Sequence, residues 1–337
     1  MQLIRRLFGV FARTRDRPPR IALALQGGGS HGAFTWGVLD RLLEDEQIEI
    51  AAISGTSAGA LNAGVLASGY ARGGRAQARA SLDAFWRDVA SAGAGFAPYA
   101  VTGLSRAFSP YLVNPLDFNP LRDITRRHVD EAALGTGPIA LFVTATAVRT
   151  GRARVFRGAE LGVAALLASA CLPFLFHAVE IGGQAYWDGG YSANPALAPL
   201  VELAPQHDIV LVKINPLVRE GVPSSGIEIM DRASEITFNA SLIAELRGVA
   251  FVSKLLREHR LSAAKYRDPR LHMIADDDGL APFAASSKLN TDIAFLERLR
   301  ELGRNAASRF LDAHRADLGR RSSLDVERAF VDERPAT

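Results

Sequence analysis

Two stretches decide the expected fold: IALALQGGGSHG at residues 21–32 and IEIAAISGTSAG at residues 48–59. Each begins with an apolar run of the length of a buried strand and passes directly into a loop of small residues. A stretch suited to a helix follows each loop, so the order strand, loop, helix occurs twice. Strands that alternate with helices predict a parallel sheet covered by helices on both faces, with the active site beyond the carboxyl ends of the strands.

The rest of the chain continues this alternation. Gly182-Gly183 separates two short apolar runs, and a two-residue glycine connection suits a hairpin whose turn needs positive φ. We therefore expect an α/β fold, a three-layer α/β/α sandwich with a mainly parallel central sheet of five or six strands. Besides the two opening runs, strand segments are expected at 139–148, 154–156, 179–181, 184–187, 208–214 and 271–274, and long helices at 226–260 and 291–314.

The composition is that of an ordinary folded protein, with 48% apolar and 22% charged residues in a chain of 337. A net charge of +3 is too small to indicate a nucleic-acid partner, and the sequence has no basic patch interleaved with aromatic residues. The single cysteine, Cys171, excludes an internal disulfide and a cysteine-based zinc cluster. The sequence has no run of about 18 or more uncharged apolar residues, so no transmembrane helix is predicted. We expect a cytoplasmic protein, either soluble or peripheral at the membrane.

The first twenty residues combine apolar and basic side chains. Arginines alternate there with apolar residues that recur at helical spacing, namely Leu3, Ile4, Leu7, Phe8 and Phe11. Two interpretations stay open: residues 1–20 are a frayed basic arm, or they form a helix that lies on an anionic membrane as a peripheral contact.

A candidate nucleophile lies in the second loop. The residues Gly55-Thr56-Ser57-Ala58-Gly59 match G-x-S-x-G, in which a sharp turn between a strand and a helix exposes the serine, and small flanking residues let the backbone close. The start of the following helix also stabilises negative charge that develops at the serine. The competing interpretation is a structural turn, because patterns of five residues recur by chance.

The first loop supplies candidate hydrogen-bond donors. Gly27, Gly28 and Gly29 offer adjacent backbone N–H groups without side chains, which an acyl-transfer enzyme needs around the oxyanion of its tetrahedral intermediate. The same loop also satisfies G-x-G-x-x-G at Gly27, Gly29 and Gly32, so a dinucleotide-binding oxidoreductase is the rival. A dinucleotide-binding fold usually has an acidic residue at the end of the second strand to bind the ribose, and this chain has Ser54 there.

The best candidate for the base that activates Ser57 is Asp188. Its carboxylate follows the predicted hairpin on a loop opened by Gly189 and Gly190, and burial would raise its pKa toward a useful value. The bland alternative is that Asp-Gly-Gly forms only a turn. Among the late histidines only His272 competes, and as a residue of a predicted strand it more often has a structural role.

Together these blocks resemble the patatin-like phospholipase family, whose pattern is a glycine-rich oxyanion loop, a G-x-S-x-G elbow and a later D-G-G/A. Residues 168–174, ASACLPF, also resemble the family's A-S-x-A-x-P block, shifted slightly, and SSKLN at 286–290 resembles bacterial members. The resemblance covers about residues 21–214. It implies a Ser-Asp dyad without histidine, in which Ser57 is the nucleophile and Asp188 the base.

The resemblance also implies the rest of the site and its chemistry. Gly27, Gly28 and Gly29 would form the oxyanion loop, and the dyad would need neither a metal nor a cofactor. A lipid or phospholipid ester would be cleaved through an acyl-enzyme. Many relatives carry Arg or Lys in the glycine-rich block where this chain has His31, so His31 is a candidate substrate contact while it is protonated. Its alternative is a local hydrogen-bonding group.

The expected organisation is one compact body with appendages. It consists of a basic amphipathic arm at 1–20, a patatin-like catalytic core at 21–215 with an acyl-chain cap over 93–119, a C-terminal helical extension packed on the core at 216–318, and a polar tail at 319–337. The aromatic residues expected in the cap are Phe96, Tyr99, Phe108, Tyr111 and Phe118. A second class of function stays open, in which the chain is a lipid-binding or regulatory protein with little turnover.

Overall fold

The computed structural model describes residues 18–101, 109–203 and 207–330, so the expected basic arm at 1–20 lies almost entirely outside the described residues. Its centre is an eight-stranded sheet in the order β5-β6-β3-β2-β1-β7-β8, with β4 paired to β3. The strands are β1 (Arg20–Leu25), β2 (Glu49–Thr56), β3 (Ala140–Ala147), β4 (Ala153–Arg157), β5 (Val179–Ile181), β6 (Gln184–Asp188), β7 (Asp208–Val212) and β8 (Leu271–Ile274).

Most strand pairs are parallel. β3, β2, β1, β7 and β8 run in one direction, and β4, β5 and β6 form antiparallel pairs at the β3 side. The prediction of a mainly parallel sheet is confirmed. The predicted size of the sheet, five or six strands, was too small, because the β5–β6 hairpin and β4 all join the same sheet through β3. The hairpin turn has the expected positive φ, 59° at Gly182 and 75° at Gly183.

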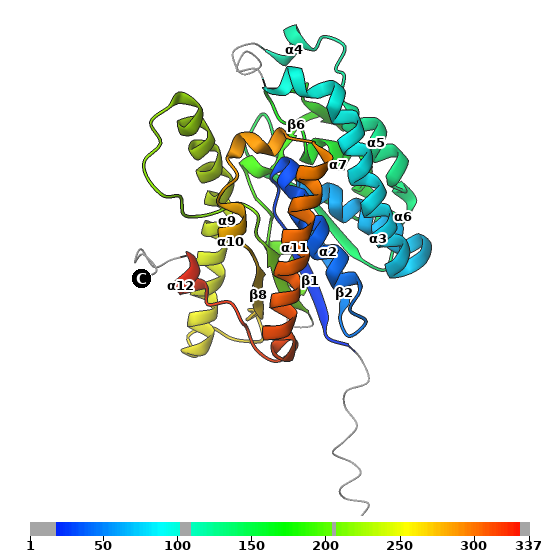
Figure 1. The fold of residues 1–337 in the computed structure, drawn as a ribbon. Coiled ribbons are helices and arrows are strands. Elements are labelled where there is room, and N and C mark those ends of the chain that lie inside the picture. The colour runs from blue at the N-terminus through cyan, green and yellow to red at the C-terminus, as the bar shows by residue number, and fades with distance from the viewer. Residues whose placement is uncertain (1–17, 102–108, 204–206, 331–337) are drawn as a thin grey trace, which may run out of the picture.

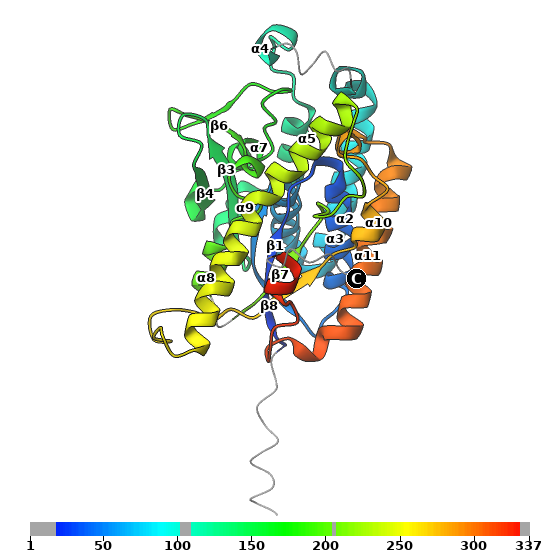
Figure 2. The same cartoon turned by 90° about the vertical axis from the view of Figure 1, so that its left-hand side faces the viewer.

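Helices cover both faces of the sheet. In Figures 1 and 2, α2, α3 and α11 lie on one face and α9 on the other. The helices are α2 (Gly32–Leu43), α3 (Ala58–Val101), α4 (Pro110–Val113), α5 (Pro120–His128), α6 (Glu131–Thr136), α7 (Val163–Ser169), α8 (Ala198–Leu203), α9 (Gly226–Arg257), α10 (Asp277–Leu280), α11 (Ile293–His314) and α12 (Val326–Phe330). The short 3-10 turns used below are η1 (Gly29–His31), η4 (Gly189–Tyr191) and η5 (Ala285–Leu289).

Strand β1 shows why the layers form. Successive side chains of a strand point to opposite faces, so Ile21, Leu23 and Leu25 join the core beneath α2 and α11, whereas Ala22 and Ala24 join the core beneath α9. Every one of these five side chains is buried. A strand that is apolar on both faces therefore lies in the middle of the sandwich, as expected for a parallel sheet.

The region expected to form an irregular cap is more helical than predicted. Helix α3 runs from Ala58 to Val101 with one kink, where Gly74 has a φ of 65°. It therefore occupies the first residues of the 93–119 segment, and the short helix α4 follows near its end. Of the five aromatic residues named for the cap, Tyr111 and Phe118 have described side chains, and both are exposed.

Two expectations for the C-terminal third need correction. The segment 216–318 is more than a helical extension, because its strand β8 pairs in parallel with β7 and completes the sheet. The segment 319–337 is not polar throughout, because it contains α12, whose Val326 and Phe330 are buried against residues of α9. Short apolar pairs in an otherwise polar stretch give too weak a periodic signal to predict such a helix.

One segment of the described chain, Glu228–Arg257 within α9, is long and apolar enough to cross a membrane by length and composition alone. A single helix of this kind is weak evidence, since helices that cover a core pass the same test. Leu242 and Leu246 of this segment are buried in the core beneath the sheet, so α9 is a covering helix in this structure.

Candidate active site

The G-x-S-x-G stretch forms a strained turn between β2 and α3. Strand β2 ends at Thr56, helix α3 begins at Ala58, and Ser57 between them has a φ of 54°. A non-glycine residue rarely adopts this left-handed conformation, which stores strain and is typical of functional turns. A side chain at Gly59 would collide with the carbonyl oxygen of Leu25 at the end of β1. The glycine therefore lets the elbow pack directly against the first loop.

A serine outside the elbow holds its backbone. The N–H of Ser57 donates to Ser169 Oγ at 2.9 Å, and Ser169 Oγ donates to the carbonyl oxygen of Thr144 at 2.6 Å. Ser169 is the last residue of α7 and is fully buried. It belongs to the ASACLPF block, so the sequence showed where this residue lies but gave no indication of its contact with the elbow.

The glycine-rich loop lies beside the elbow, and only part of it is free to bind an oxyanion. The N–H of Gly27 donates to Asn194 Oδ1 at 2.6 Å, which corrects the expectation that Gly27 is an oxyanion donor. Among the described residues, the N–H groups of Gly28 and Gly29 have no acceptor. Asn194 thus fixes the start of the loop and leaves the next two amides available, beside the unpaired N–H groups of the first turn of α3.

Asp188 lies at the end of β6 and is fully buried. Its Oδ1 accepts the N–H of Gly190 at 2.8 Å, whereas its Oδ2 has no partner among the described residues. Burial raises the pKa of this carboxyl to about 6, against the opposing effects of the neighbouring Ser57 hydroxyl, the Gly190 N–H and the Lys288 ammonium. A carboxylate with this pKa is suited to accept a proton near neutral pH.

The two glycines after Asp188 are required by the packing. They begin η4, and a side chain at Gly189 would collide with the carbonyl oxygen of Thr144. A side chain at Gly190 would collide with the ring of Phe238 on α9. The Asp-Gly-Gly stretch is a turn, as the alternative interpretation predicted. The same turn brings the carboxylate to the elbow.

His272 has a structural environment, as its position in a strand predicted. It is fully buried on β8, where Nδ1 lies 2.8 Å from Ser323 Oγ and Nε2 lies 3.3 Å from Asp208 Oδ2. Asp208 begins β7, whereas Ser57 follows the carboxyl end of β2, so His272 lies toward the opposite end of the sheet from the elbow.

His31 does not have the environment of a cationic substrate contact. It is 1% exposed, and its Nε2 lies 2.7 Å from Ser287 Oγ. Burial, together with the charges of Lys288 and Arg219, lowers the pKa of His31 to about 3, so the ring is neutral at ordinary pH. The local hydrogen-bonding interpretation fits this position, whereas binding of an anion by a protonated ring does not.

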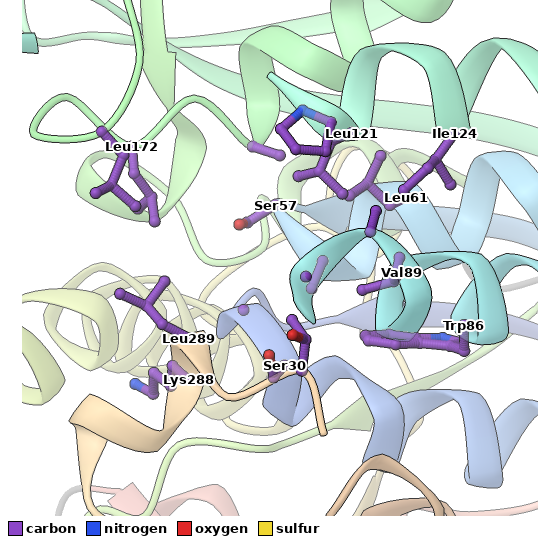
Figure 3. A pocket seen from close by; sticks show the side chains of 18 of the residues that line it. Ser30, Ser57, Leu61, Trp86, Val89, Leu121, Ile124, Leu172, Lys288 and Leu289 are labelled. Atoms are coloured by element: carbon purple, nitrogen blue, oxygen red, sulfur yellow. The ribbon is translucent and has the colours of Figure 1, made fainter. Parts of the chain in front are cut away.

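An apolar pocket opens at Ser57 (Figure 3). Its walls come mainly from α3 and α5 rather than from the expected cap, and it has a volume of about 140 Å³. An apolar cavity of about 150 Å³ is enough to hold benzene, so this pocket can take part of an acyl chain. Its large apolar side chains are Leu61, Phe85, Trp86, Val89, Leu121, Ile124, Leu172, Leu175, Phe176 and Leu289.

Within the described parts of the chain, no group of three or more His, Cys, Asp or Glu residues could hold a metal ion. Cys171 is buried, and burial raises the pKa of its thiol to about 12, so it is an unreactive thiol.

The chain is similar to one known family and to a few solved structures. The model of the family described as patatin-like phospholipase matches residues 23–201, and no curated protein matches. VipD from Legionella pneumophila is 15% identical at a TM-score of 0.42, with 88% of this chain and 67% of that chain covered. A chain of the ExoU–SpcU complex from the type III secretion system of Pseudomonas aeruginosa is 20% identical at a TM-score of 0.37, with 88% and 52% covered.

The chain thus spans about half the length of the chain in the second structure. The family match covers more than half of the present chain and includes β2, the elbow, η1 and Asp188. The chain belongs to the patatin-like phospholipase family.

Proposed function

We propose that this protein is a lipid acyl-hydrolase that cleaves carboxylic ester bonds through a Ser57–Asp188 dyad and an acyl-enzyme intermediate. Membership of the family supports hydrolysis of lipid esters. The observation that carries the dyad is the buried Asp188 carboxylate, whose Oδ2 has no partner among the described residues and whose pKa depends on the neighbouring Ser57 hydroxyl. In a free enzyme, such catalytic hydrogen bonds are often long and shorten only when substrate binds.

Acylation follows from this arrangement. Ser57 Oγ attacks the ester carbonyl carbon while Asp188 Oδ2 accepts the hydroxyl proton, and the carbonyl electron pair moves to oxygen. The resulting oxyanion accepts hydrogen bonds from the N–H groups of Gly28 and Gly29, and from the N–H of Ala58 at the start of α3. Collapse of this intermediate breaks the bond to the alcohol, which leaves with the proton from Asp188.

Deacylation repeats these steps with water. Asp188 accepts a proton from the attacking water, and the same amides hold the second oxyanion. Collapse releases the fatty acid and returns the proton to Ser57 Oγ. The apolar pocket holds the acyl chain through both steps, so the carbonyl stays beside the amides.

The dinucleotide-binding alternative has little support. The end of β2 carries Ser54, Gly55 and Thr56, none of which is acidic, so the usual ribose ligand is missing from this position. The carbonyl oxygen of Lys288 also packs directly against Gly29 of the glycine loop.

The proposal is tested by comparing wild type with Ser57→Ala on p-nitrophenyl octanoate and on a phosphatidylcholine, each with and without EDTA. We expect hydrolysis by wild type alone, unchanged by EDTA. The matched control is Ser91→Ala, which removes an exposed serine from the same helix and should leave the rate at the wild-type value.

A second measurement reports the nucleophile directly. A fluorophosphonate should modify wild type once, with the added mass on the peptide that contains Ser57, and should not modify Ser57→Ala. If Ser57→Ala hydrolyses both esters as fast as wild type, the dyad is wrong. If wild type binds lipid but hydrolyses neither ester, the lipid-binding alternative replaces the proposed function.

A further inference from the structure

Lys288 lines the same pocket as Ser57, although it lies outside the part of the chain that matches the family model. It is carried by η5, and the carbonyl oxygen of Lys288 packs so closely against Gly29 that any side chain there would collide with it. The segment η5 therefore packs directly on the glycine-rich loop. Among the described residues that line the pocket, Lys288 is the one that carries a charge.

The ammonium of Lys288 has neutral partners. Its Nζ donates to Asn215 Oδ1 at 2.7 Å and lies 5.6 Å from the centre of the Phe238 ring, a cation–π arrangement. Asn215 in turn donates through Nδ2 to the carbonyl oxygen of Gly27 at 2.9 Å. The lysine is thus connected to the glycine-rich loop through a single asparagine, and at least one of its N–H donors is not used by Asn215.

No carboxylate within the described residues lies at ion-pair distance from Lys288. Two acidic groups on α9 that act on its charge bind elsewhere: Asp231 accepts the N–H of Ser286, and Glu235 pairs with Arg219. A third, Asp188, acts on this charge from the proposed dyad and likewise forms no ion pair with Lys288. Burial lowers the pKa of Lys288 to about 8, which leaves most of the ammonium protonated at neutral pH. A half-buried cation that forms no direct ion pair is stabilised when an anion joins it.

The position of Lys288 relative to Ser57 indicates which part of a substrate it would meet. In Figure 3, Trp86 and Ile124 lie on one side of Ser57. Lys288 lies on the other side, next to Leu289. An ester bound at Ser57 with its acyl chain along Trp86 and Ile124 directs its alcohol portion toward Lys288. In a glycerophospholipid, that portion carries the phosphate.

We propose that Lys288, held by Asn215 and Phe238, binds the negatively charged phosphate of the substrate's head group. This inference rests on the proposed function and deepens it, since it assigns a residue to the choice between phospholipids and neutral esters. His31 is neutral and faces Ser287, so it does not supply this charge.

The test uses p-nitrophenyl octanoate as a neutral reporter substrate and dodecyl phosphate as a competitive inhibitor, below its critical micelle concentration. Dodecyl maltoside is the neutral inhibitor of matched chain length. We expect Lys288→Met to raise the inhibition constant of dodecyl phosphate, relative to that of dodecyl maltoside, by about tenfold or more, the effect of losing one hydrogen bond to a charged group. Lys288→Arg should restore most of the difference.

The outcomes separate this proposal from the proposed function. Equal effects of Lys288→Met on the two inhibitors would overturn the head-group role and leave the dyad untouched. Inorganic phosphate that competes as tightly as dodecyl phosphate would also overturn it, because the site would then bind a free anion. If wild type hydrolyses no ester, calorimetric titration of dodecyl phosphate into wild type and Lys288→Met tests the same residue without turnover. Lys288→Gln replaces Lys288→Met if thermal unfolding shows that the methionine variant is not folded.

Discussion

Replacement of Asp188 by asparagine should lower activity and raise stability in the same protein. The amide that replaces the carboxylate cannot accept the Ser57 proton, and a positioned general base contributes about 10²–10⁴-fold to the rate. We therefore expect kcat/KM for p-nitrophenyl octanoate to fall by at least about a hundredfold at pH 8. Asparagine keeps the shape of the side chain and an oxygen for the Gly190 N–H, so the turn should survive.

The gain in stability follows from the raised pKa. The pKa of Asp188 is about 6 in the folded protein against an ordinary value of 3.8, so the folded state binds this proton more tightly than the unfolded chain. The carboxylate therefore lowers the free energy of unfolding as pH rises from about 4 through 6, and the loss is complete above that range. At 1.36 kcal/mol for each pKa unit, the loss is about 3 kcal/mol, which Asp188→Asn removes.

The assay is thermal unfolding of wild type and Asp188→Asn at pH 4.5 and pH 8, with the ester assay run in parallel. The difference in Tm between the two proteins should grow by about 5 °C in favour of the variant between these pH values. Wild-type kcat/KM should fall about tenfold for each pH unit below pH 6, because a protonated Asp188 cannot act as a base. Asp83→Asn, on the accessible side of α3, is the control and should change neither quantity appreciably.

Two results would refute the reasoning separately. An Asp188→Asn variant that keeps more than a tenth of wild-type kcat/KM shows that Asp188 is not the base. A difference in Tm that is the same at both pH values shows that burial does not raise the pKa of this carboxyl. A loss of stability at pH 8 would instead mean that Ser57, Gly190 and Lys288 together stabilise the carboxylate by more than burial destabilises it.

Three further substitutions test the surroundings of the dyad. Ser169→Ala leaves the Ser57 N–H without its buried acceptor, so we expect a loss of about 1–3 kcal/mol in unfolding free energy and a fall of about tenfold in kcat/KM, measured by thermal melts and the ester assay. Gly59→Ala forces a methyl group onto the Leu25 carbonyl and should sharply reduce the yield of soluble protein, with normal yield as the contrary result. His272→Ala removes a partner of Asp208 and should lower Tm while kcat/KM stays within twofold at a temperature where the variant is folded; a hundredfold loss would make His272 a candidate base.

Much of the fold was predictable because buried parallel strands are short, apolar and bounded by glycine. Every strand of the sheet begins and ends within a few residues of its expected position, including the hairpin with Gly182 and Gly183. The size of the sheet was underestimated, because a sequence gives no indication of which short strands share hydrogen bonds with β3. Helix α12 was missed for a related reason, since its two buried side chains become a signal only once α9 lies opposite them.

The segments that carry the proposed dyad residues were predictable for a different reason. Ser57 and Asp188 each lie in a short glycine-flanked segment, and such glycines mark in the local sequence where the backbone turns sharply or packs closely. Most of these glycines meet their own segment or a neighbouring strand, whereas Gly190 meets Phe238 on α9. The oxyanion loop was predictable only in part. The sequence predicts Gly27 as an oxyanion donor, but in the structure its N–H donates to Asn194, a residue 167 positions later. A hydrogen bond over that distance along the chain leaves no local pattern.

Lys288 and Asn215 also act through contacts between segments that are far apart in the sequence. Both lie beyond the family match at residues 23–201, and the segment that carries Lys288 resembles bacterial relatives without indicating what its side chain contacts. Their effect comes from packing, because η5 lies on the glycine loop and brings a cation to a pocket that is otherwise uncharged among its described lining residues. In the proposed mechanism the bond-breaking groups come from the glycine-flanked core motifs, whereas discrimination between anionic and neutral head groups would come from the C-terminal third. That division predicts that substitutions at Lys288 change which ester is chosen, and substitutions at Asp188 change whether any ester is cleaved.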